Sequence, residues 1–157
     1  MSTGFLPSEL VELLEREAEQ RGSTPEALTV QLLLRLAPEE ERPRILVRAA
    51  ETLLDHAGRL VEAGKYGEAC RRVWSSILLA LDAHAVLLGS KLPRGLRDYV
   101  RLSEEAGREN KVFMDAFYAG IAALVAWREG AGSPGHCERI LWWASQLLET
   151  VKSRTHG

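Results

Sequence analysis

One stretch of the sequence, residues 60–88, restricts the possible folds more than any other. It reads LVEAGKYGEACRRVWSSILLALDAHAVLL, so that one helix ends at Gly64 and a second begins near Tyr66. The second helix is apolar around most of its circumference and leaves only a narrow polar strip. Such a helix belongs at the centre of a protein, where other helices surround it. The stretch therefore predicts an all-α fold built around a two-helix core.

The rest of the chain shows the same helical periodicity. Apolar residues recur at intervals of three and four, and β-branched residues are few, so no strands are expected. Proline and glycine mark the ends of the elements. We expect one domain over residues 1–157, with an N-terminal helical hairpin at 1–37 and a helical bundle at 38–152. Seven helices are predicted, over about 7–21, 24–36, 44–63, 66–88, 95–106, 111–128 and 133–152.

Charge and hydropathy exclude some classes of protein. The formal net charge is −2, which argues against a strongly basic protein that coats nucleic acid or an anionic membrane. No apolar run reaches the roughly 18 residues that a membrane span needs, and the first residues do not resemble a secretory leader. We therefore expect a cytoplasmic protein without a membrane partner. One asparagine and three glutamines are few for this length, which is typical of a thermophilic source.

The two cysteines do not form a recognisable motif. Cys70 and Cys137 are far apart in the sequence, with no CxxC spacing and no histidine-rich partner segment. Neither a zinc site nor a disulfide framework is indicated, and we expect two reduced thiols in the core. We expect no metal and no cofactor.

Four segments together resemble the PaREP family, archaeal paralogous-repeat proteins with a HEPN-like helical fold. They are LPSELVELLEREAEQRG, the acidic linker after it, EAGKYGEACRRVWSSILLALDAHA, and LRDYVRLSEEAG, and the resemblance covers about residues 5–151. It implies a HEPN-like bundle, an archaeal source, and self-association as a homodimer. It implies no defined biochemical role.

HEPN proteins that act as ribonucleases carry an arginine followed after four to six residues by a histidine, and this chain has no such pair. The nearest cases, Arg48 with His56 and Arg128 with His136, are eight positions apart. No catalytic residue is therefore nominated. A divergent HEPN-type ribonuclease or nucleotide-binding protein, using arginines together with Asp82 or His84, stays as an alternative.

Four arginines form a ridge near the fifth predicted helix. At 100° per residue, the arginines of this ridge fall within about 60° of one another. The members of this arginine ridge are Arg94, Arg97, Arg101 and Arg108. Guanidinium groups at this spacing suit phosphate binding, with nucleic acid as the candidate partner. Because Asp98, Glu104 and Glu105 lie beside them, a solvated and ion-paired surface is the second interpretation.

Two helices offer candidate interfaces. On the last helix, Trp142 lies opposite the apolar side, so that either a partner or another segment of the chain covers it. The sixth helix carries a large apolar side with Phe113, Phe117 and Ile121, which either the bundle buries or a second copy completes. Dimerisation through one of these surfaces is expected.

Asp82 and His84 are polar residues in the most apolar helix. Residues two apart point in different directions, so they do not form a pair by themselves. We interpret both as hydrogen-bonded core residues. The function that the sequence favours is an interaction module that self-associates, with nucleic acid or a nucleoprotein as candidate partners.

Overall fold

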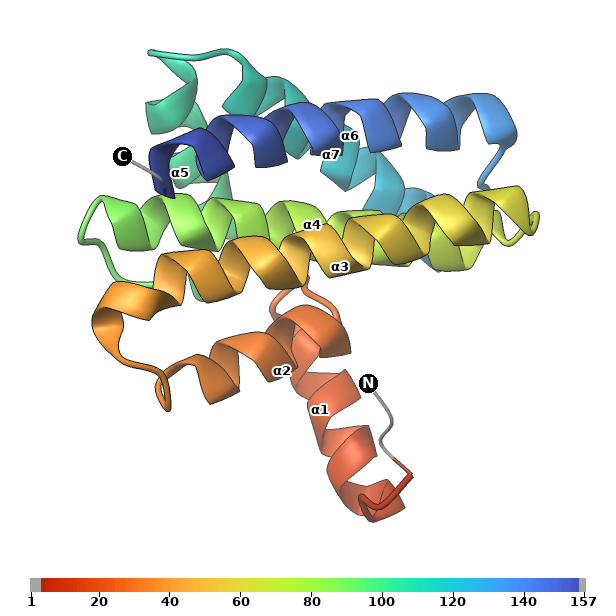
Figure 1. Cartoon of the computed structure of the whole chain (residues 1–157). Helices are drawn as coiled ribbons and strands as arrows, with labels where there is room; N and C mark the ends of the chain where they lie inside the picture. The colour runs from red at the N-terminus through yellow and green to blue at the C-terminus, as the bar shows by residue number, and fades with distance from the viewer. Residues whose placement is uncertain (1–3, 156–157) are drawn as a thin grey trace.

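The computed structural model describes residues 4–155, and these residues form a bundle of helices without strands (Figure 1). The predicted all-α class and the seven predicted α-helices are confirmed for this part of the chain. The helices are α1 (Ser8–Gln20), α2 (Pro25–Leu34), α3 (Arg42–Glu62), α4 (Tyr66–Leu87), α5 (Leu96–Gly107), α6 (Val112–Glu129) and α7 (Pro134–Thr155), with a short 3-10 helix, η1 (Glu39–Glu41), before α3.

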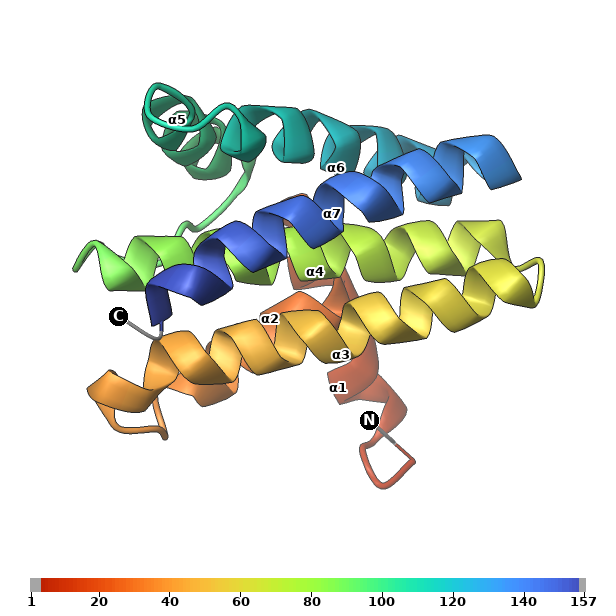
Figure 2. The same ribbon diagram turned by 45° about the horizontal axis from the view of Figure 1, so that its top comes forward.

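The helix α4 is the centre of the bundle, as its sequence predicts. Every residue from 73 to 85 is buried, and α4 packs against α2, α3, α5, α6 and α7. In Figure 2, α4 lies between α3 and α6, and α7 crosses in front of it. A helix that is surrounded on all sides has no free face, which explains why its sequence lacks a broad polar side.

The turn between α3 and α4 forms where the sequence GKYG predicts it. Gly64 has a φ of +76°, a left-handed conformation that glycine adopts without a steric penalty. The backbone N–H of Lys65 donates to the carbonyl of Leu60 at 2.8 Å and closes the end of α3. The turn therefore sets the two long helices antiparallel and side by side.

The first helix behaves differently from the other six. Figure 1 shows α1 extending away from the bundle, and within the described part of the chain it packs against no helix except α2. Ala18 is its one buried residue. The next helix, α2, begins at the predicted cap, where Thr24 Oγ1 accepts a hydrogen bond from the N–H of Ala27 at 3.1 Å. The predicted hairpin is thus a docked α2 with a projecting α1.

Among residues 4–155, none of the helices combines the length and the apolar character that crossing a bilayer requires.

Candidate interaction surfaces

The arginine ridge lies on the surface of α5 and its flanking turns. All four arginines are exposed, and within residues 4–155 none of them makes an ion pair. Asp98 forms no ion pair with these guanidinium groups, and its carboxylate accepts a hydrogen bond from the backbone N–H of Arg94 at 2.9 Å. A shallow groove of about 470 Å³ brings Arg94 and Arg101 together with Lys91. Asp98 and Glu105 line the same groove, so the positive charge there is partly balanced.

Trp142 is exposed on α7. Its side chain is 54% accessible, and its ring packs edge-to-face on Trp143 with the centroids 4.8 Å apart. Of the two predicted arrangements, burial by another segment does not occur within the described residues. A tryptophan side chain with half of its surface exposed to solvent is unusual in a monomeric protein, so Trp142 marks a candidate contact site.

For two of the candidate interface residues on α6, the structure shows the first of the two predicted arrangements, burial by the bundle, so these two are not interface residues. Phe113 and Phe117 are 0% and 2% exposed, so the chain buries both of them without a partner. Phe113 packs on His84 at 4.5 Å between ring centroids, and Phe117 packs on Trp74 at 5.9 Å. Ile121, the third candidate, is partly buried. A helix that is apolar on several sides does not indicate which side faces inward, so the sequence could not distinguish them.

The exposed side of α6 carries other apolar residues. Tyr118 and Val125 are 57% and 53% accessible, and Ala122 lies between them at helical spacing. A groove of about 350 Å³ runs between α6 and α7, and most of its lining is apolar. The lining residues are Asp115, Tyr118, Ala119, Ala122, Gly135, His136, Arg139, Ile140 and Trp143. We call this groove, with Val125, the α6–α7 face.

Three of the large apolar side chains that are exposed lie on or beside α1. Phe5 is 83% accessible, Leu13 55% and Leu10 51%. The same segment is acidic, because α1 contains five glutamates and one arginine. We call residues 5–20 the α1 arm. Exposed apolar side chains at helical spacing mark a candidate contact site, and the sequence alone did not indicate that Leu10 and Leu13 are exposed whereas Ala18 on the same helix is buried.

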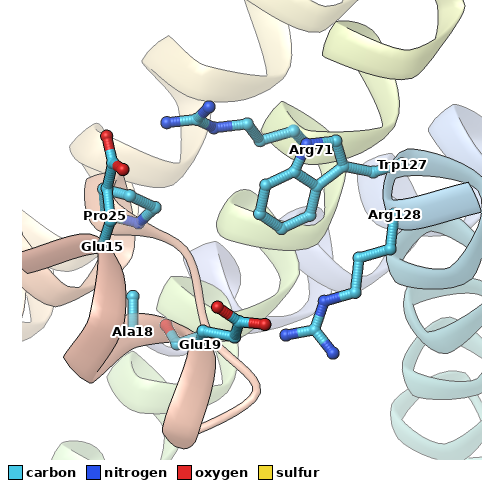
Figure 3. A pocket seen from close by; sticks show the side chains of 8 residues that line it. Glu15, Ala18, Glu19, Pro25, Arg71, Trp127 and Arg128 are labelled. Atoms are coloured by element: carbon cyan, nitrogen blue, oxygen red, sulfur yellow. The ribbon is translucent and has the colours of Figure 1, made fainter. Parts of the chain in front are cut away.

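A pocket of about 490 Å³ lies in the elbow between the α1 arm and the bundle. Glu15, Ala18, Glu19, Ser23, Pro25, Arg71, Trp127 and Arg128 line it. Figure 3 shows the side chains of Glu19 and Arg128 pointing toward one another across this space. The guanidinium of Arg71 lies 5.3 Å from the centroid of the Trp127 ring. The same guanidinium donates hydrogen bonds to the Glu26 carboxylate from Nε at 3.1 Å and from Nη2 at 2.6 Å. Because these charged groups face one another or are already paired, the elbow favours holding the arm over binding a ligand.

Asp82 is the most unusual polar residue of the core. It is 0% exposed, and its two carboxyl oxygens accept hydrogen bonds from Gln31 Nε2 at 2.6 Å and Tyr99 Oη at 2.7 Å. Burial raises the pKa of the Asp82 carboxyl to about 7, although the two hydrogen bonds lower it in part. Because solvent does not reach Asp82, the residue joins α2, α4 and α5 and does not contact a substrate.

His84 belongs to a separate cluster on another side of α4. Its Nδ1 is 3.1 Å from Arg154 Nη1, and Phe113 covers its ring. Burial and the neighbouring Arg154 charge lower the pKa of His84 below its usual value. The structure therefore does not bring Asp82 and His84 together as an acid–base pair. Within residues 4–155, no group of three histidine, cysteine or acidic side chains is placed to hold a metal ion.

The two cysteines are buried and unbonded, as predicted, but they are neighbours in space. Cys70 in α4 and Cys137 in α7 have their sulfur atoms 3.7 Å apart. Nothing in their spacing along the sequence indicates this contact, because it depends on how α7 packs on α4.

Comparison with known proteins does not identify the chain. No family model, no curated protein and no solved structure matches it. Membership of the PaREP family stays a prediction. The surfaces of the bundle and of the α1 arm are therefore the features that bear on the function of this protein.

Proposed function

We propose that this protein is a helical interaction module that self-associates through its α1 arm. The observation that carries the proposal is the projection of α1 from the bundle with Phe5, Leu10 and Leu13 in solvent. Burying exposed apolar area of this kind on a partner is favourable by about 25 cal/mol per Å². A second copy of the chain is the partner that we propose.

The charge of the arm favours some partner surfaces over others. Two α1 arms placed side by side would bring ten glutamates against two arginines, and like charges oppose that pairing. The arginine ridge has the right charge, but Val100 is the one large apolar side chain of α5 that is well exposed. The α6–α7 face offers a mostly apolar groove that contains Arg139 and His136 at one side and a single acidic residue, Asp115. It is therefore the surface of the second copy that fits an acidic amphipathic helix.

This arrangement is a helix laid in a groove, a common mode of recognition. If each copy places its arm in the α6–α7 face of the other, the two contacts are related by a two-fold axis and the assembly closes as a dimer. We propose in addition that the bundle is HEPN-like and that the chain belongs to the PaREP family. The four sequence segments described above support that assignment.

Sedimentation equilibrium over a range of protein concentrations tests self-association. The unaltered chain should shift from monomer to dimer, and the double variant Leu10→Glu/Leu13→Glu should remain monomeric with an unchanged thermal midpoint. The matched control is Leu32→Glu/Leu33→Glu, which changes two leucines of similar exposure on α2 and should still dimerise. A monomer at every concentration, or equal dimerisation of both double variants, would contradict the proposal.

Nucleic-acid binding by the arginine ridge is a second proposed function. Four exposed guanidinium groups without ion pairs in the described part of the chain support it. Fluorescence anisotropy of labelled single-stranded RNA over a salt series should show binding that weakens with salt and is lost in Arg97→Glu/Arg101→Glu. The same samples on a gel would reveal cleavage, which tests the alternative of a divergent ribonuclease.

A further inference from the structure

Cys70 and Cys137 form a buried dithiol that none of the functions proposed above uses. The two sulfur atoms are 3.7 Å apart, and the residues are 1% and 2% exposed. They lie at the same end of the bundle, because Cys70 is in the second turn of α4 and Cys137 is in the first turn of α7. These are the two free cysteines of the described chain, and the fold places them in direct contact.

We propose that Cys70 and Cys137 are a modification site, at which a small-molecule disulfide oxidises the pair to an intramolecular disulfide. The first step forms a bond between one cysteine sulfur and a sulfur of the oxidant, and the other half of the oxidant leaves as a thiol. In the second step, the other cysteine displaces the remaining half as a second thiol. Two protein thiols and one oxidant disulfide thus become one protein disulfide and two small thiols, so that atoms and electrons balance.

The geometry indicates which cysteine reacts first. Burial, together with the adjacent Cys137, raises the pKa of the Cys70 thiol to about 12, so Cys70 stays protonated at neutral pH. Cys137 is in the first turn of α7, directly after the connector of residues 130–133, which contains two glycines. Opening of this first turn exposes Cys137 without unfolding α4. Cys137 therefore attacks the oxidant, and Cys70 resolves the mixed disulfide when α7 returns.

The connector is packed closely enough to control this opening. A Cβ at Gly132 would lie 2.9 Å from the Cβ of Tyr66, the first residue of α4, so the glycine allows the connector to approach α4. The Sγ of Cys137 also lies 3.9 Å from the carbonyl oxygen of Tyr66. While this end is closed, both sulfurs are shielded from solvent, so oxidation should be slow and should depend on the opening of α7.

Intact-mass spectrometry of the native protein incubated with oxidised glutathione tests the proposal. The expected product is a monomer that has lost two hydrogen atoms, carries no glutathionyl group and has no thiol that reacts with Ellman's reagent after denaturation. Reduction with dithiothreitol should restore the original mass. Persistent glutathionyl adducts, a disulfide-linked dimer on a non-reducing gel, or unchanged thiols after prolonged exposure would overturn the proposal.

Two matched variants test the order of the steps. Cys70→Ser keeps Cys137, the thiol that the opening of α7 exposes, and removes the resolving thiol, so it should accumulate one glutathionyl group. Cys137→Ser keeps only the shielded thiol and should gain that group several-fold more slowly. Equal rates of modification in the two variants would refute the assigned order. Thermal melts of both variants establish that they are folded, and the result for the unaltered chain decides the proposal without them.

Discussion

Replacement of Asp82 by asparagine should change how the stability of this protein depends on pH. The side chain is fully buried, and its pKa is raised from the ordinary 3.8 to about 7. The unfolded chain therefore loses this proton near pH 4, whereas the folded chain keeps it until about pH 7. As pH rises through this interval, ionisation stabilises the unfolded state alone, and the free energy of unfolding falls.

The size of the effect follows from the difference between the two pKa values. Each pKa unit corresponds to about 1.4 kcal/mol, so a difference of about three units removes ~4 kcal/mol of stability between about pH 4 and pH 8. An asparagine at position 82 cannot ionise and escapes this loss. We therefore expect the Asp82→Asn variant to gain stability relative to the unaltered chain as pH rises, by up to ~4 kcal/mol.

Urea unfolding followed by far-UV circular dichroism at several pH values measures this difference. His84 has a lowered pKa, so its contribution changes in the opposite direction and is lost as pH falls. Because both proteins contain His84, its contribution cancels in the difference. A difference that is constant with pH would refute the reasoning, because it would mean that Asp82 ionises normally in the folded protein.

A second variant separates the hydrogen bonds from burial. The hydroxyl of Tyr99 donates to Asp82 Oδ1 at 2.7 Å and favours the charged carboxylate. Removing that donor in Tyr99→Phe should raise the pKa of Asp82 further, so the loss of stability should continue to higher pH than in the unaltered chain. An identical pH profile in the two proteins would show that the Tyr99 hydrogen bond does not influence the pKa of Asp82, which burial and the Gln31 hydrogen bond would then set.

Three further predictions concern packing and can be checked by thermal and urea unfolding. Gly120→Ala places a Cβ 2.7 Å from the Trp74 ring and should lower the free energy of unfolding by about 1–3 kcal/mol. Its control, Gly58→Ala, has open space around the new Cβ and should raise the free energy of unfolding by roughly 0.5–1 kcal/mol. Equal effects of the two changes would contradict the close approach of α6 to α4. Trp74→Phe leaves the Gly22 carbonyl without its 2.8 Å donor and should cost about 2–4 kcal/mol, so a neutral result would show that this bond is dispensable. The oxidised dithiol closes a loop of 67 residues and should stabilise the protein by about 4 kcal/mol relative to the reduced form, which an unchanged urea midpoint would contradict.

The sequence predicts some features of this protein well because they depend on local pattern. The central position of α4 follows from its all-round apolar character, and the start of α2 follows from Thr24 and the proline after it. The orientation of α6 does not follow, because several of its sides are apolar and its neighbours decide which one is buried. The contact between Cys70 and Cys137 and the bonds of Asp82 join residues far apart in the chain, so no local pattern encodes them.

The first two helices are attached unequally to the bundle, which is what the proposed interaction arm requires. The α2 end of the hairpin is fixed to α4 through a hydrogen bond of 2.6 Å between Thr24 and Ser75. Glu26 adds an ion pair with Arg71 at 2.6 Å, and it also binds Arg72. These bonds are inside one chain, so α2 belongs to the bundle of its own copy. The α1 arm has no comparable bonds to the bundle among the described residues, so Leu10 and Leu13 are available to the proposed second copy without disturbing the core.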